Sequence, residues 1–330
     1  MNFADFQQLR AQMQHERKDV LDCAETNLYR ALTRHIPPAT HTAEHTVHRC
    51  DLAARWAKLF DFPPETARRA LVSCGVRHSL AVLFQYYAAK GARLWLPEDN
   101  YPVYGELASA AGLAPRTFPT LPAPRWPAAD CDTETAPELL VVTNPLKPLG
   151  RWLDSADVSA LTAWLAASSR RRLLLDAVYT FETRFHGSTL NLLRTGQTLL
   201  LHSLTKGWLS PRLFGVTLVP ITDVLALTPL FRHQPPPQAN LIRAHELLAS
   251  HFDLPATVAR ELDSAQNRLC AALPLELPRP TASATPRYLF PIAARWSDLV
   301  AEFGVLGLPA SVFGSARKNI TILGSLNFTL

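Results

Sequence analysis

Several features that define common protein classes are missing from this 330-residue sequence. Its five cysteines include no C-x-x-C pair, so neither a disulfide framework nor a thiolate zinc site is indicated, and we expect buried thiols. The sequence contains no run of about eighteen apolar residues, the length that a bilayer-spanning helix needs. Residues 1–20 are charged and amphipathic and do not match a secretory signal. We therefore expect a cytoplasmic protein with no membrane partner.

Charge of one sign is not concentrated in any part of the chain. The 33 basic and 28 acidic residues give a net charge of +5 that is spread along the sequence, so we expect no nucleic-acid partner. We interpret the densest run, Arg170-Arg171-Arg172, as a solvated helix end. Lysine is scarce, which makes any lysine inside a motif a candidate functional residue. The six lysines are Lys18, Lys58, Lys90, Lys147, Lys206 and Lys318.

Short apolar runs alternate with helical patterns up to about residue 220. Runs that are too short for helices and apolar on both faces are typical of strands in a covered parallel or mixed sheet. The expected strands are 70–72, 93–96, 139–142, 173–175, 199–201 and 216–219, and the expected helices between them are 79–90, 104–111 and 155–168.

The pattern changes beyond residue 237. Helices are expected at 240–251 and 254–272, followed by strands at 288–290 and 320–323. Proline-rich stretches at 115–127, 229–237 and 274–286 separate the segments. The sequence predicts an α/β fold whose large domain, 46–240, has a mostly parallel mixed sheet covered by helices. A smaller α+β domain is expected from residues 1–45 and 241–330.

Chemically distinctive residues follow the apolar runs, where an open α/β sheet binds its ligands. In order along the chain they are Gly75, Tyr101, Lys147, Asp176 with Tyr179, and Lys206. A glycine turn that opens a helix offers backbone N–H groups to a phosphate. An amine, a carboxylate and an aromatic ring are the other parts that an aldehyde cofactor such as pyridoxal phosphate needs.

This arrangement resembles the fold-type-I pyridoxal phosphate enzymes of the class I/II aminotransferase superfamily. The matching motifs occur in the family's order over roughly residues 70–220. They are G-V-R-H-S-L from Gly75, P-E-D-N-Y-P-V-Y from Pro97, N-P-L-K-P-L-G from Asn144, D-A-V-Y from Asp176 and S-L-T-K from Ser203.

The resemblance implies three catalytic residues: Lys206 as the Schiff-base lysine, Asp176 as partner of the pyridine nitrogen, and Tyr179 as donor to the phenolate oxygen. It also implies that Tyr101 stacks on the cofactor ring and that the N–H groups of the Gly75 turn bind its phosphate. The full cofactor-binding set is Gly75, Val76, Arg77, Tyr101, Asn144, Lys147, Asp176, Tyr179, Ser203, Lys206 and Arg212.

Three positions depart from the family pattern. Lys147 replaces the asparagine that contacts the phenolate oxygen, and it could serve that oxygen, face solvent or face an acidic substrate. The loop that holds Arg212, the candidate phosphate arginine, is one residue short. Asn319 stands where the family has its carboxylate-binding arginine, which leaves Arg317 and Asn27 as the candidate substrate-binding residues.

The sequence thus predicts a pyridoxal phosphate-dependent enzyme that acts at the Cα of an amino acid or amine, with transamination the leading reaction. A decarboxylase or a cyclase or elimination enzyme, similar to capreomycidine synthase, is an alternative, and the resemblance implies a homodimer. A zinc hydrolase is a minor alternative, because His41, Glu44 and His45 spell H-x-x-E-H. A catalytically silent protein of the same fold is another.

Overall fold

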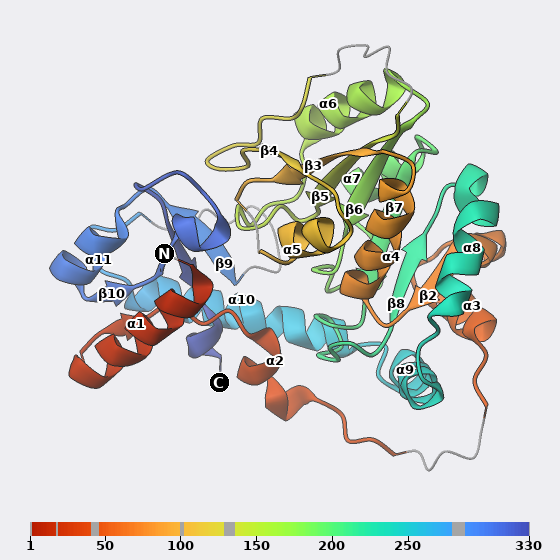
Figure 1. The fold of residues 1–330 in the computed structure, drawn as a ribbon. Coiled ribbons are helices and arrows are strands. Elements are labelled where there is room, and N and C mark those ends of the chain that lie inside the picture. Colours follow the sequence, from red (N-terminus) through yellow and green to blue (C-terminus); the bar gives the residue numbers. More distant parts are fainter. Residues whose placement is uncertain are drawn as a thin grey trace.

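A seven-stranded mixed sheet forms the centre of the computed structural model, which describes residues 2–17, 19–40, 46–99, 102–128, 136–278 and 288–329 (Figure 1). Its strand order is β2-β8-β7-β6-β5-β3-β4, and β8 alone among these seven runs antiparallel to its neighbours. The strands are β2 (Ala70–Ser73), β3 (Arg93–Pro97), β4 (Arg116–Phe118), β5 (Glu138–Thr143), β6 (Arg171–Asp176), β7 (Thr198–Ser203) and β8 (Gly215–Leu218).

Helices cover both faces of this sheet, and alternate strand residues face two separate cores. In β5, Leu140 and Val142 belong to one buried cluster, whereas Leu139 and Val141 belong to the other. Burial on both faces explains why the strands read as continuous apolar runs. One face is covered by α4 (Val76–Ala88), α5 (Val103–Ala110) and α8 (Val224–His233), and the other by α3 (Arg49–Leu59), α6 (Ser155–Ala166) and α7 (Gly187–Leu193).

A smaller part of the molecule is built from both chain ends, which lie near each other in Figure 1. β1 (Leu21–Asp22) pairs in parallel with β10 (Val305–Leu306), and a second sheet has the order β11-β12-β9. Its strands are β9 (Leu289–Ile292), β11 (Leu308–Pro309) and β12 (Thr321–Gly324). The helices here are α1 (Phe3–Glu16), α2 (Leu28–Ala31), α10 (Leu254–Ala272) and α11 (Trp296–Phe303).

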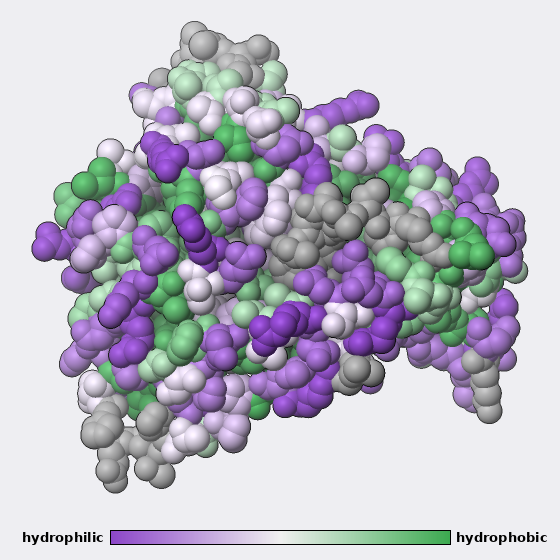
Figure 2. Space-filling model, turned by 180° about the vertical axis from the view of Figure 1, so that it is seen from behind, coloured by the Kyte–Doolittle hydropathy of each residue, from purple (hydrophilic) through white to green (hydrophobic). Residues whose placement is uncertain are grey.

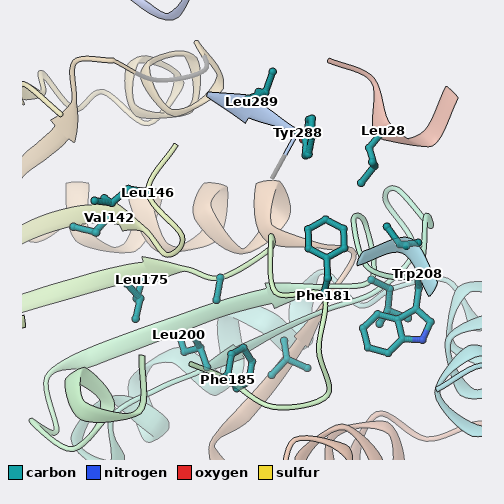
Figure 3. Close-up of a cluster of buried hydrophobic side chains, with 14 of the residues drawn as sticks. Leu28, Val142, Leu146, Leu175, Phe181, Phe185, Leu200, Trp208, Tyr288 and Leu289 are labelled. Carbon is teal, nitrogen blue, oxygen red and sulfur yellow. The ribbon is translucent and has the colours of Figure 1, made fainter. Parts of the chain in front are cut away.

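The remaining elements connect these parts. α9 (Gln238–Ser250) packs against α3, beside the large sheet. Short 3-10 helices occupy η1 (Thr33–His35), η2 (Pro64–Arg69), η3 (Ile221–Asp223), η4 (Ala310–Phe313) and η5 (Leu326–Phe328). Side chains from both parts meet in one core, where Leu28 and Tyr288 lie above Phe181 and Trp208 (Figure 3).

The structure confirms the predicted α/β fold class, and each expected strand corresponds to an observed one. The predicted helix 254–272 matches α10 at both ends. Two proline-rich stretches contain regular structure that the sequence did not indicate. β4 lies within 115–127, and Pro229 lies inside α8, so the prediction that 229–237 only separates elements is wrong.

The arginine run is not a solvated helix end. Arg171 and Arg172 lie in β6, where Arg171 is 4% exposed. The Arg171 Nε lies 2.8 Å from a Glu138 carboxylate oxygen, and the Arg172 Nε lies 2.7 Å from one of Asp223. Arg171 is buried and Arg172 is partly buried, and each pairs with a carboxylate, from β5 and η3 respectively, as charges withdrawn from water require.

The prediction of buried thiols holds for Cys23 but is wrong for Cys50, which is exposed, and Cys74 and Cys270 are partly exposed. Cys131 lies outside the described residues. In the part of the chain that the structure describes, no helix combines the length and apolarity that crossing a bilayer requires. Hydrophilic residues are distributed over the face that Figure 2 shows, and hydrophobic ones form small areas between them.

Candidate active site

The carboxyl ends of three parallel strands bring the predicted catalytic residues together. β5, β6 and β7 are neighbours, and Thr143 at the end of β5 pairs with Asp176 at the end of β6. The loops that follow these strands carry Lys147, Tyr179 and Lys206. The Nζ atom of Lys206 lies 5.2 Å from the centroid of the Tyr179 ring, and the Nζ atom of Lys147 lies 4.6 Å from it.

Asp176 is a buried carboxylate that two donors hold in place. Its Oδ1 accepts the Val178 backbone N–H at 2.9 Å, and its Oδ2 accepts the Tyr104 hydroxyl. Burial raises the pKa of Asp176 to about 6, while the two hydrogen bonds and the nearby Lys206 charge act in the opposite direction. The group is therefore mostly ionised at neutral pH, ready to accept a hydrogen bond from a ring N–H.

Tyr104 was not among the residues predicted from the sequence. It lies in the first turn of α5, and burial raises the pKa of its phenol well above the usual value, so the hydroxyl stays a donor to Asp176. Its only sequence signal is its position three residues after Tyr101 in the P-E-D-N-Y-P-V-Y motif.

Lys147 is 7% exposed, which excludes the solvent-facing alternative for this residue. Its Nζ atom lies 4.6 Å from the ring centroid of Tyr288 as well as from that of Tyr179. Tyr288 is 1% exposed and lies directly before β9 in the smaller part of the molecule. The sequence reasoning also missed Tyr288, because nothing near it in the chain marks it as a site residue.

The N-terminus of α4 forms an anion-binding cradle at the same edge of the sheet. Gly75, the N-cap, has no side chain and a φ of 130°, which favours glycine. A Cβ atom at Gly75 would lie 3.9 Å from both Ser203 Cβ and Thr205 Oγ1. The Ser203 hydroxyl donates to Thr205 Oγ1 at 3.0 Å. Backbone N–H groups and two hydroxyls thus gather where a phosphate would be bound.

Four further predicted cofactor-binding residues differ in burial and contacts. Val76 is buried at the start of α4, whereas the side chains of Arg77 and Arg212 are exposed. Asn144 lies behind the site, since its amide donates to the Ser188 and Thr189 hydroxyls of α7 and accepts the Leu153 N–H. That side chain fixes the loop that carries Lys147.

The two predicted substrate-binding residues are exposed or partly exposed at the protein surface. Asn27 is exposed, and its side chain caps α2 by accepting the Arg30 N–H at 3.2 Å. Arg317 is partly exposed in a loop that contacts the end of β3, because the Ala316 N–H donates to Glu98 at 3.4 Å.

Tyr101, His41, Glu44 and His45 lie outside the described residues. Among the residues that are described, no group of three or more His, Cys, Asp or Glu side chains could hold a metal ion. The zinc-hydrolase alternative therefore gains no support from the described part of the chain.

The groups at this edge fit pyridoxal phosphate in chemistry and placement. A buried carboxylate suits a pyridinium nitrogen, an adjacent lysine suits an aldehyde, and the uncapped α4 N-terminus suits a phosphate. Together, the fold and this donor set define a pyridoxal phosphate-dependent enzyme of the aminotransferase type.

The chain belongs to the aminotransferase class I and II family, whose model matches residues 12–217. Members of this family use pyridoxal phosphate as cofactor. No curated protein matches the chain at a significant level.

Solved structures of the same fold include YbdL from Escherichia coli, identified as a methionine aminotransferase (TM-score 0.70, 17% identity, 99% of this chain and 93% of that one). An aminotransferase from Mycobacterium tuberculosis has a TM-score of 0.67 and 18% identity over 98% of this chain and 91% of that one. Apo-BacF from Bacillus subtilis has a TM-score of 0.68 and 15% identity over 99% and 92%.

Proposed function

We propose that this enzyme transfers the amino group of an amino acid or amine to an acceptor carbonyl compound. One observation carries the proposal: the buried carboxylate of Asp176 ends β6, the amine of Lys206 follows the adjacent parallel strand β7, and the Lys206 charge acts on the pKa of that carboxylate. Bound pyridoxal phosphate supplies an electron sink for the bonds at the substrate Cα. The remaining chemistry falls to the protein's own side chains.

Lys206 would hold the cofactor aldehyde through its amine, and the same amine, when free, would move the proton at the substrate Cα. Asp176 would accept a hydrogen bond from the ring nitrogen and hold the proton there, because its negative charge favours the protonated ring. Tyr104 and the Val178 N–H orient that carboxylate. Tyr179 donates its hydroxyl to the ring oxygen.

The α4 cradle would hold the phosphate through the N–H groups of Val76 and Arg77 and the hydroxyls of Ser203 and Thr205, while the Gly75 N–H donates to the Ser73 hydroxyl at 3.2 Å. Arg212 contributes its charge from the loop after β7, and Tyr101 stacks on the cofactor ring.

The substrate is an amino acid or amine whose charged group is met by Arg317 and Asn27 at the rim of the site. We further propose that the protein acts in the cytoplasm as a homodimer. Decarboxylation, cyclisation or elimination is the second candidate, because Asn319 stands where the family has its carboxylate-binding arginine. A changed carboxylate-binding position favours a reaction other than transamination at the substrate Cα.

Absorbance spectroscopy tests the proposal directly. Purified protein mixed with pyridoxal phosphate should develop a visible absorbance band, and borohydride reduction should fix the cofactor on Lys206, as mapped by mass spectrometry. Lys206→Ala should lose the band, whereas Lys58→Ala, which changes an exposed lysine of α3, should keep it. Failure of the wild type to bind the cofactor would favour the catalytically silent alternative.

Product analysis then separates the reactions. Each amine or amino acid that changes the spectrum is incubated with a 2-oxo acid acceptor. Transamination predicts a new amino acid in an amount equal to the substrate consumed. Release of carbon dioxide or ammonia without that product would refute transamination in favour of the second candidate.

A further inference from the structure

Lys147 is held on a rigidly anchored loop. Its backbone N–H donates to Thr143 Oγ1 at 3.0 Å, and Pro145 and Pro148 flank it on either side. Asn144 ties the same loop to α7, and the Gly150 N–H donates back to the Leu146 carbonyl at 2.7 Å. These contacts fix the backbone from which the lysine side chain extends toward Tyr179.

Two tyrosine rings from distant parts of the chain face the ammonium group in that region. The ring centroids of Tyr179 and Tyr288 are 5.9 Å apart with an interplanar angle of 46°, and the Lys147 Nζ atom lies 4.6 Å from each. The negative face of an aromatic ring attracts an ammonium ion, more strongly where water is excluded. At 7% exposure the charged form of Lys147 therefore gains stabilisation from both rings.

Tyr288 is held in place by contacts within the smaller part of the molecule. Its carbonyl accepts the Ser325 N–H at 3.0 Å, next to the end of β12, and its ring is 1% exposed. Figure 3 shows its side chain beside Leu28, across from the loops that end β5 and β6. The smaller part of the molecule thus supplies one wall of the lysine's surroundings.

Two lysines bring positive charge to the Tyr179 ring. Lys147 and Lys206 both approach its ring, and Asp176 is the carboxylate whose pKa the Lys206 charge affects. When Lys206 is consumed in binding an aldehyde, Lys147 remains as a full positive charge beside Tyr179. An ammonium stabilises an oxygen anion more strongly than the neutral amide found at this position in the family.

On the basis of the proposed function, we propose that Lys147 is a fixed cation that binds the anionic ring oxygen of the cofactor, and that Tyr288 is the positioning residue that holds it there. A cation at that oxygen lowers the basicity of the nitrogen through which Lys206 binds the cofactor. The absorbance of the bound cofactor changes as this nitrogen loses its proton, so the pH at the midpoint of that change should be low in the wild type.

Substitutions at position 147 test the charge. We expect Lys147→Asn to raise the midpoint by about one pH unit, a tenfold change in proton affinity, and Lys147→Arg to keep it near the wild-type value. An unchanged midpoint in Lys147→Asn would overturn this inference while leaving the proposed function intact. Absence of any cofactor band in the wild type would overturn both.

Substitutions at position 288 test the positioning role. Tyr288→Phe keeps a ring face and should leave the midpoint unchanged, whereas Tyr288→Leu should raise it part of the way toward that of Lys147→Asn. In cofactor-free protein, acetylation of Lys147 by acetic anhydride, mapped by mass spectrometry, should be several-fold faster in Tyr288→Leu and unchanged in Tyr288→Phe. Equal rates in the leucine variant and the wild type would refute the role of Tyr288, and circular dichroism checks that each variant is folded.

Discussion

Replacing Asp176 with asparagine should stabilise the cofactor-free protein while weakening cofactor binding. Burial raises the pKa of Asp176 from 3.8 to about 6, so the folded state keeps a proton that the unfolded state releases between these values. Stability is therefore lost as the pH rises through this window. An uncharged side chain avoids the loss.

The size of the effect follows from the same values. A difference of about two pH units corresponds to about 3 kcal/mol of unfolding free energy at pH 8. At pH 5, part of the way through the window, the difference is about half as large. Weaker hydrogen bonds from Tyr104 and Val178 to asparagine subtract about 1 kcal/mol at both pH values. The gain from Asp176→Asn should thus be about 2 kcal/mol at pH 8 and about 0.5 kcal/mol at pH 5.

Urea unfolding of cofactor-free wild type and variant at the two pH values measures this gain, with cofactor affinity measured by absorbance on the same samples. A stability difference between the two proteins that is the same at pH 5 and pH 8 would show that Asp176 does not titrate as its burial requires. We expect Asp176→Asn to bind the cofactor more weakly and to be more stable than the wild type at pH 8, because the buried charge serves function at a cost in stability.

Three other substitutions test the site. Tyr104→Phe removes a donor to Asp176, so fluorescence titration should show about tenfold weaker cofactor binding at pH 6 and a smaller loss at pH 9. Gly215→Ala places a Cβ atom 2.6 Å from the Gly75 Cα, so urea unfolding should show a loss of about 2 kcal/mol, whereas Gly187→Ala should be tolerated. Asn144→Ala removes three hydrogen bonds and takes away the partner that the structure shows for the Thr189 hydroxyl and for the Leu153 N–H, so it should cost about 3 kcal/mol in the same assay.

The positions of the strands along the chain and the meeting of the motifs at one sheet edge could be predicted from the sequence for a simple physical reason. Strands buried on both faces read as short apolar runs, and the carboxyl ends of adjacent parallel strands meet at one edge. Asp176 and Lys206 are therefore recognisable from what precedes them in the chain. Their individual roles, like that of Tyr101, stay predictions.

Contacts across the chain could not be predicted in this way. Tyr104 reaches Asp176 from another element, and Tyr288 reaches Lys147 from the opposite part of the molecule. The ion pair of Arg171 with Glu138 likewise depends on the register of β5 and β6, so the arginine run looked solvent-exposed in isolation. The local sequence pattern predicts burial and turns, whereas the tertiary fold determines which side chains contact one another.

The pairing of β1 with β10 has a consequence for how the polypeptide assembles. Leu21 pairs with Val305, so β1 finds its neighbour only after β2 to β9 have been synthesised. The central sheet can form meanwhile, because its strands follow one another more closely. Before β10 is synthesised, the Cys23 N–H lacks the Leu306 carbonyl to which it donates at 2.8 Å in the folded protein. Helix α1, which precedes β1 in the chain, is also synthesised before β10.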